Sequence, residues 1–185
     1  FWAQSKIVVL AGTGGNGGGG ICAARHLANR HLKVKLCVTS KERLKEVPRW
    51  QYQIFRNTSG MDIGPEELKK ESPDLILDAL IGYSLNGAPT GLPADLISWA
   101  NEQTCPILSL DVPSGVDAST GETPGVYIKA TWTLTLALPK TGLVREKCGQ
   151  LFLADLGIPA GVYAKCGISY IPPFGNRFWV PLDWA

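Results

Sequence analysis

Several residue types and patterns that particular protein classes require are scarce in this chain of 185 residues. Only two histidines occur, His26 and His31, and both fall in one predicted helix, so histidine acid–base catalysis and a histidine zinc site have little support. The five cysteines form no CxxC or CxxxC pair, which argues against a disulfide framework and against structural zinc. No apolar run approaches the ~18 residues that a membrane span needs, so we expect no membrane insertion.

Charged residues are also few, and they are unevenly distributed. They make up 18% of the chain, below the ~25% of ordinary domains, whereas glycine and proline number 21 and 13. Residues 1–60 hold ten Lys and Arg against two acids, and residues 61–185 hold eight against fourteen. This basic first third suits an anionic ligand such as a nucleotide, or nucleic acid, unless it is only a set of solvated side chains. Because we expect reduced thiols and see no targeting segment, the sequence predicts an intracellular, cytoplasmic location.

Apolar segments rich in β-branched residues alternate with helical patterns along the chain. This alternation predicts a single α/β domain over residues 1–185, with an open and mainly parallel sheet. The last segment, 171–185, contains prolines and large aromatics and is expected to form an extended C-terminal arm packed on the body or on a partner. The strands are predicted at 7–11, 34–38, 51–55, 75–80, 107–110, 131–137 and 150–154, and the helices at 21–31, 41–47, 65–71 and 92–103.

Three segments that suit ligand binding follow predicted strands. The segment Gly12–Gly20 (GTGGNGGGG) is a predicted loop whose N–H groups can point at an anion beside a helix N-terminus. Asp78 interrupts an apolar strand near its end, just before the loop 82–88, and Asp111 ends the strand that precedes Ser114. Ligands of open parallel sheets bind at the carboxyl ends of the strands, so we expect these segments to form one site.

Each segment also has a simpler interpretation, which the sequence leaves open. The glycine loop suits a tight strand–helix turn, Asp78 suits a cap for the loop that follows it, and Asp111 suits an Asx turn. The GxGxxG spacing within the glycine loop is typical of a dinucleotide site, although no acid ends the second predicted strand to bind a ribose. Lys140 follows another strand and is expected either to reach a phosphate or to lie on the surface.

Four strings taken together resemble the YjeF N-terminal domain family, the NAD(P)H-hydrate epimerases. They are GTGGNGGGGICAARHL, DLILDALIG, LDVPSGVDASTG and TLTLALPKTGL, in the family's order and at plausible spacing over residues 7 to about 157. The resemblance implies a Rossmann-like three-layer αβα sandwich and a nicotinamide-nucleotide repair reaction, the interconversion of the R and S forms of hydrated NADH and NADPH. It also implies a bound potassium ion, a homodimer, and a separate dehydratase that acts on the product.

The same resemblance implies roles for individual residues. Asp111 is the expected catalytic group and also contacts the substrate. Potassium is expected on Asn16, Asp78 and Ser114, whose carboxylate, amide and hydroxyl oxygens suit a hard cation. The other residues expected to bind the substrate are Gly15, Asn16, Gly17, Gly18, Gly19, Gly82, Tyr83, Ser84, Leu85, Asn86, Gly87 and Ala88.

The chain departs from the family's Asn-Asn-Gly-Gly-Asp loop at two positions. Gly15 replaces the first Asn and Gly19 replaces the Asp, so two substrate-facing side chains are absent while the backbone is kept. Two alternatives therefore stand beside the epimerase. One is a catalytically weakened relative that binds a nucleotide or serves as an RNA or protein scaffold; outside that alternative, we expect no nucleic-acid partner. The other is an NADP-dependent oxidoreductase, for which no Tyr-Lys or His donor stands at a telling spacing.

Overall fold

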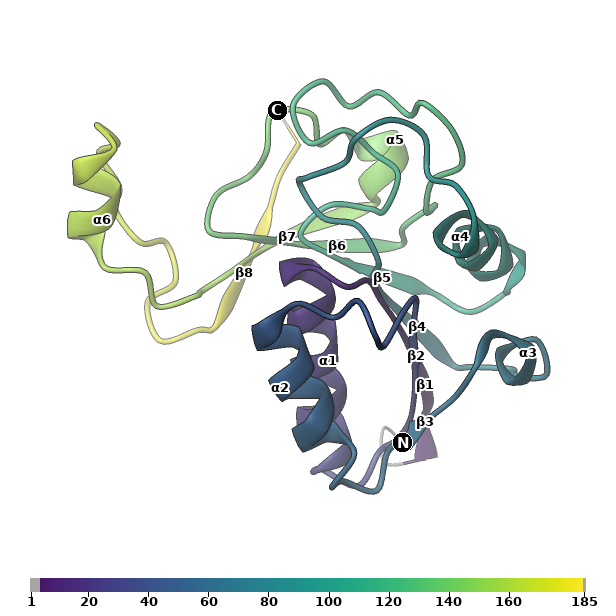
Figure 1. Cartoon of the computed structure of the whole chain (residues 1–185). Helices are drawn as coiled ribbons and strands as arrows, with labels where there is room; N and C mark the ends of the chain where they lie inside the picture. The colour runs from purple at the N-terminus through teal and green to yellow at the C-terminus, as the bar shows by residue number, and fades with distance from the viewer. Residues whose placement is uncertain (1–3, 185) are drawn as a thin grey trace.

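Eight strands form one sheet in the computed structural model, which describes residues 4–184 (Figure 1). Their order is β3-β2-β1-β4-β5-β6-β7-β8, and all neighbours run parallel except β7 and β8, which run antiparallel. The mainly parallel α/β sheet predicted from the sequence is therefore confirmed. The strands are β1 (Lys6–Ala11), β2 (Lys33–Val38), β3 (Met61–Asp62), β4 (Leu75–Ala79), β5 (Ile107–Leu110), β6 (Trp132–Leu136), β7 (Gln150–Ala154) and β8 (Trp179–Leu182).

Helices cover both faces of the central strands and give the expected three layers. Figure 1 shows α1 and α2 on one face, α3 and α4 on the other, and α6 projecting away from the body at the far left of the view. No helix in the described part of the chain is long and apolar enough to cross a membrane. The helices are α1 (Gly15–Ala28), α2 (Glu46–Phe55), α3 (Pro65–Leu68), α4 (Leu92–Glu102), α5 (Arg145–Cys148) and α6 (Ala160–Lys165).

Strand β1 is apolar without interruption after its first residue because both of its faces are buried. Successive side chains of a strand point to opposite faces of the sheet. Val9 packs in the core cluster under α1, whereas Val8 and Leu10 pack in the cluster that includes α4. Because β1 lies between β2 and β4, the strand order reverses there, and ligands of such sheets bind at the carboxyl ends of these strands.

The prediction of a loop over Gly12–Gly20 is wrong, because α1 begins at Gly15 and ends at Ala28 rather than covering 21–31. Glycine disfavours helices locally, but here close packing requires it. A Cβ atom at Gly17 would lie 1.9 Å from the carbonyl oxygen of Gly12, and one at Gly20 would lie 2.4 Å from the Cβ of Ala79. These glycines let α1 start directly against the ends of β1 and β4.

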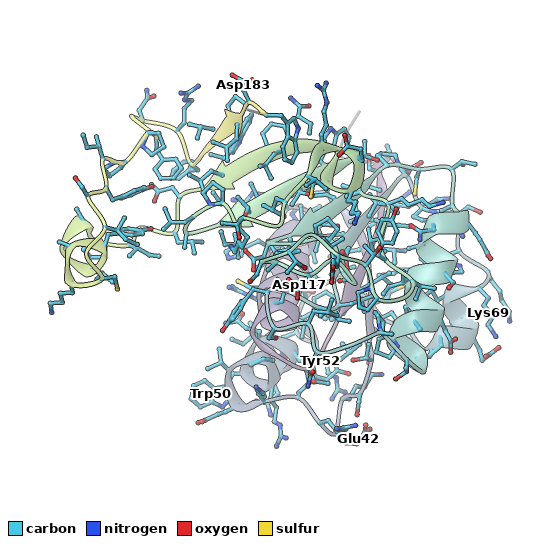
Figure 2. All side chains as sticks on the ribbon, turned by 90° about the horizontal axis from the view of Figure 1, so that it is seen from above. Glu42, Trp50, Tyr52, Lys69, Asp117 and Asp183 are labelled. Atoms are coloured by element: carbon cyan, nitrogen blue, oxygen red, sulfur yellow. The ribbon has the colours of Figure 1, made fainter. Side chains whose placement is uncertain are left out.

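The predicted helix at 41–47 and strand at 51–55 are also wrong, since α2 occupies Glu46–Phe55. Gln and apolar residues alternate over residues 51–55, a pattern typical of a strand, but the inward-facing residues of the whole segment repeat with a helical period. Pro48 and Phe55 are buried and Tyr52 packs against the same core. Figure 2 shows Trp50 on the outer side of α2 and Tyr52 nearer the body. Tertiary packing therefore determines this element.

The C-terminal segment joins the sheet through β8, which the sequence did not predict as a strand. Strand β8 pairs with β7, and the ring of Trp179 meets that of Phe152 edge-on, with centroids 5.2 Å apart. Residues 179–182 of the segment expected to form an extended arm are therefore part of the sheet. Strand β3 and helices α5 and α6 were also absent from the sequence-based predictions.

Candidate active site

Asp78 is a fully buried carboxylate at the end of β4. Its Oδ2 accepts hydrogen bonds from Ser109 Oγ at 2.8 Å and from the Ser114 N–H at 2.9 Å. Its Oδ1 accepts from Ser114 Oγ at 2.5 Å and from the Leu80 N–H at 3.2 Å. Burial raises the pKa of Asp78, and these hydrogen bonds oppose that shift. None of the ion pairs within residues 4–184 includes Asp78, so neutral groups surround the carboxylate.

Ser114 connects Asp78 to the loop that follows β4. The Ile81 N–H donates to Ser114 Oγ at 2.8 Å, and the same hydroxyl lies 3.1 Å from the Ile81 carbonyl oxygen. Both Asp78 and Ser114 are fully buried. The structure therefore brings together two of the three residues expected to bind potassium, and adds a main-chain carbonyl oxygen beside them.

A cleft of about 420 Å³ lies between the start of α1 and the loop after β4. Helix geometry leaves the N–H groups of the first turn of α1 without intrahelical acceptors, and the helix dipole makes this end attractive to anions. Lys45 lines the cleft and adds a positive charge. The other lining residues are Thr13, Gly14, Gly15, Asn16, Gly17, Leu80, Ile81, Gly82, Tyr83 and Ser84.

The remaining residues expected in the two substrate loops lie outside the cleft lining. A Cβ atom at Gly18 would face Pro48 at 3.0 Å, and one at Gly19 would face the Leu110 side chain at 2.9 Å. Residues 85–88 continue the second loop, where Gly87 has a φ of 72°. The geometry therefore separates the first three residues of each loop from the rest.

Asn16 is the third residue expected to bind potassium, and it is one of the residues lining the cleft. Its Oδ1 and Nδ2 are both buried and have no hydrogen-bond partner within the described residues. Buried amides are nearly always hydrogen-bonded, so an unpartnered one indicates a position that a ligand, ion or water completes. Asn16 therefore offers a buried, unpartnered amide in the cleft, next to Gly82.

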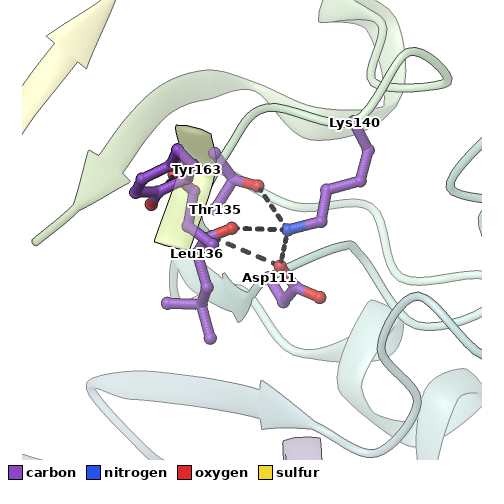
Figure 3. Close-up of polar contacts among 6 residues, drawn as sticks. Asp111, Thr135, Leu136, Lys140 and Tyr163 are labelled. Carbon is purple, nitrogen blue, oxygen red and sulfur yellow. Dashed lines mark hydrogen bonds and ion pairs between the residues drawn. The ribbon is translucent and has the colours of Figure 1, made fainter. Parts of the chain in front are cut away.

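Asp111 ends β5 in a conformation that side chains rarely adopt. Its φ is 71°, in the left-handed region, and its exposed fraction is 5%. The Lys140 ammonium forms an ion pair with Asp111 Oδ1, which also accepts a hydrogen bond from the Leu136 N–H at 3.3 Å (Figure 3). The carboxylate is thus bound by the segment after β6, and the Asx turn considered for it does not describe these contacts.

Lys140 is the residue that sequence reasoning misplaced. It was considered as a phosphate ligand or a surface lysine, but its ammonium points inward to Asp111. The available signal was its position just after β6, the strand next to β5 in a parallel sheet, where both strands end at the same edge. That signal gives proximity, whereas the direction of the side chain depends on the turn after β6.

The end of β2, where the sequence has no acid to bind a ribose, lies next to a polar network centred on Asp62. Lys41 Nζ and Tyr52 Oη lie 2.6 and 2.5 Å from the same oxygen of Asp62. Burial and the hydrogen bond to Asp62 raise the pKa of Tyr52. Lys41 is therefore already paired with an acid of this chain.

Fold and site together define an α/β domain with a Rossmann-like sheet and a glycine-lined cleft at its topological switch point. Residues 1–142 match the family model described as YjeF-related protein N-terminus. The chain belongs to this family. The yeast protein YNL200c has the same fold in its crystal structure, with a TM-score of 0.82 and 21% identity over 97% of this chain and 78% of that one.

Three curated relatives differ in what their names describe. The NAD(P)H-hydrate epimerase of Dehalogenimonas lykanthroporepellens is 50% identical over 96% of this chain and 73% of its own length. The bifunctional NAD(P)H-hydrate repair enzyme Nnr of Moorella thermoacetica is 37% identical over 88% of this chain. The human enhancer of mRNA-decapping protein 3 is 30% identical over 98% of it. This chain spans only 33% and 34% of the last two proteins.

Proposed function

We propose that this chain is an NAD(P)H-hydrate epimerase, an isomerase that interconverts the R and S forms of hydrated NADH and NADPH. The observation that carries the proposal is Asp111, a buried, ion-paired carboxylate at the same sheet edge as the glycine-lined cleft. The 50% identity to a protein named as this epimerase supports the same activity. In this proposal the cleft binds the substrate and the Asp111 carboxylate transfers the proton.

The cleft suits the phosphates of a dinucleotide. The N–H groups of Gly15, Asn16 and Gly17 stand at the positive end of α1, and Lys45 adds a full charge. Gly82, Tyr83 and Ser84 form the opposite wall. We assign substrate binding to these residues and to Asp111. The other residues proposed to contact the substrate, Gly18, Gly19 and residues 85–88, lie outside the cleft lining, as Asp111 does, and we propose that they contact it through their main chain.

Asp111 is proposed to move the proton that epimerisation requires. Inversion at the hydrated ring carbon proceeds if its hydroxyl loses a proton while the carbon–nitrogen bond opens and the ring nitrogen gains a proton. Closure on the other face reverses these transfers and yields the other epimer. A positioned carboxylate contributes roughly 10²–10⁴-fold to such a step. Asp111 is fixed for this role by Lys140 and the Leu136 N–H.

A potassium ion is proposed as the cofactor, and the residues present fit one. Asp78 is a buried carboxylate among neutral donors, and Asn16 has a buried amide oxygen without a partner in the described chain. Ser114 and the Ile81 carbonyl add two oxygens next to Asp78. When bound, potassium would supply a cationic partner for the Asp78 carboxylate, which forms no ion pair within the described residues. Asn16, Asp78 and Ser114 would hold it.

We further propose a homodimer and a separate dehydratase that consumes the product. An apolar hollow of about 240 Å³ on the sheet face supports a second copy as partner. Light scattering that gives twice the chain mass would agree with the dimer, and a monomeric mass at micromolar concentration would contradict it. The hollow is lined by Leu108, Trp132, Leu134, Phe152 and Trp179.

The activity is tested with purified R-form NADPHX in potassium buffer, coupled to a dehydratase specific for the S form. Wild-type protein should accelerate the recovery of NADPH absorbance, and Asp111→Asn should lower kcat by roughly 10²–10⁴-fold. Asn is the suitable replacement because it tolerates the left-handed conformation of Asp111. Asp183→Asn is the control, since that exposed aspartate lies at the periphery in Figure 2.

A scaffold or binding module is the second candidate. Gly15 and Gly19 lack the side chains of the family loop, and the decapping-protein relative aligns with nearly the whole chain. A folded wild-type protein without epimerase activity, but with salt-sensitive RNA binding, would favour this candidate. Hydride transfer from intact NADPH would instead favour the oxidoreductase alternative.

A further inference from the structure

The Lys140 ammonium has three acceptors around it, which is as many hydrogen bonds as it can donate. They are Asp111 Oδ1 in the ion pair, the Leu136 carbonyl oxygen at 2.7 Å, and Thr135 Oγ1 at 3.3 Å (Figure 3). Any direct contact between Lys140 and a substrate would require one of these to break. The arrangement therefore suits a residue that acts through Asp111.

The two carboxylate oxygens of Asp111 have different surroundings. Oδ1 receives both the Lys140 ammonium and the Leu136 N–H, and the described residues place no donor on Oδ2. Oδ2 is also absent from the fully buried unpaired atoms of this part of the chain, so it reaches solvent. Figure 3 shows the second oxygen turned away from Lys140. One oxygen is held, and the other is free of protein donors within the described residues.

The backbone on both sides of the ion pair is constrained in the same way. Asp111 has a φ of 71° and Ala137, which directly follows β6, has a φ of 62°. A left-handed non-glycine residue is strained and persists only where the surroundings enforce it. The turn at Ala137 directs residues 138–140 back over the strand end, and the Tyr163 hydroxyl donates to the Ala137 carbonyl at 3.2 Å. Strain is thus concentrated where Lys140 meets Asp111.

We propose that Lys140 is the positioning residue of the active site: it holds the Asp111 side chain by its Oδ1 and leaves Oδ2 as the oxygen that exchanges the substrate proton. This inference rests on the proposed epimerase function. Lys140 does not touch the substrate, so its removal should impair the chemical step and leave substrate binding nearly unchanged.

The test compares kcat and KM of four proteins in the coupled assay: wild type, Lys140→Met, Lys140→Arg and Lys147→Met. Methionine keeps the length of the side chain and removes its charge. Lys140→Met should lower kcat by about 10²-fold and change KM by less than about threefold, and Lys140→Arg should restore kcat by about tenfold over Lys140→Met. Lys147→Met is the matched control, because Lys147 also donates to a main-chain carbonyl, that of Gly121, and should keep wild-type kcat.

A double variant separates positioning from a purely structural role. Because Lys140 acts through Asp111, Asp111→Asn with Lys140→Met should be no slower than Asp111→Asn alone. If the kcat losses of the two single substitutions multiply in the double variant, the inference is overturned. It is also overturned if Lys140→Met keeps wild-type kcat, or if urea unfolding shows that Lys140→Met is largely unfolded under the assay conditions. An inactive wild type would instead refute the proposed function, and the inference with it, before any variant is compared.

Discussion

Asn16 lies directly under Gly82, where an added Cβ atom would come within 3.0 Å of the Asn16 Cβ. This contact joins the two loops that line the cleft, and a side chain at position 82 would require Asn16 to shift. It also keeps the unpartnered Asn16 amide covered by main chain rather than by another side chain.

Replacing Gly82 by alanine should therefore impair the site more than the fold. The methyl group would displace Asn16, and we expect Gly82→Ala to lower kcat/KM by at least tenfold in the coupled assay, or about 1.4 kcal/mol. Gly161→Ala is the matched control, since a Cβ there meets nothing within 4 Å. Equal activity of the two variants would contradict the assigned contact.

The two positions that depart from the family loop should respond differently to restoration. A Cβ at Gly15 meets nothing within 4 Å, whereas one at Gly19 would lie 2.9 Å from the Leu110 side chain. Gly15→Asn should leave the free energy of unfolding within about 1 kcal/mol of wild type and lower KM. Gly19→Asp should destabilise the fold by roughly 1–3 kcal/mol through overpacking. Urea unfolding and KM values check both, and a neutral Gly19→Asp would show that Leu110 adapts.

Potassium should stabilise the folded chain if the proposed site exists. At 100 times its Kd, a bound ion adds about 2.7 kcal/mol. We expect a higher Tm in potassium chloride than in choline chloride at equal ionic strength, and no such difference for Asn16→Ala. A control substitution, Asp183→Asn, should keep the wild-type difference. An equal Tm of the wild type in potassium chloride and in choline chloride would rule out a potassium site of useful affinity.

Cys37 should make the fold sensitive to alkaline pH. Burial, with a smaller contribution from Asp62, raises the pKa of this thiol from 9.0 to about 11. Between these values the unfolded thiol ionises before the folded one, so its stabilising contribution is complete below pH 9 and is lost as pH rises towards 11. The loss amounts to roughly 2–3 kcal/mol at 1.36 kcal/mol per unit.

The measurement is urea unfolding of wild type and Cys37→Ala at several pH values from 8 to 11. The difference in unfolding free energy between the two proteins should shrink across that range. A constant difference would show that Cys37 titrates alike in the folded and unfolded chain. Cys166→Ala, at an exposed thiol, is the control and should follow wild type.

Much of the sheet could be predicted because strand signals are local. The segments 107–110 and 150–154 are apolar or alternating and became β5 and β7 with the predicted bounds. The helix at Glu46–Phe55 was missed because the alternation over residues 51–55 competes with the helical spacing of Pro48, Tyr52 and Phe55, and packing on α1 favours the helix. Strands β5 and β7 were predicted because their residue pattern determines them, whereas packing on a neighbouring element decides helix α2.

The candidate site divides in the same way. Strand ends in a parallel sheet meet at one edge, and this rule correctly placed Asp78 with Ser114. The pairing of Asp111 with Lys140 depends on the left-handed turn at Ala137. Because position 137 is an alanine and not a glycine, the sequence gives no sign of this turn. Proximity was therefore accessible from the sequence, whereas the direction of Lys140 required the folded backbone.

The last strand has a consequence for how this domain meets other molecules. Pro181 lies within β8 opposite Phe152, and a proline carries no N–H to offer to a further strand. At the opposite edge, β3 has only two residues. Short or proline-bearing edges discourage the strand-to-strand recruitment that leads to aggregates. Growth of the sheet is thus blocked at both described edges, and association of copies is directed to its faces.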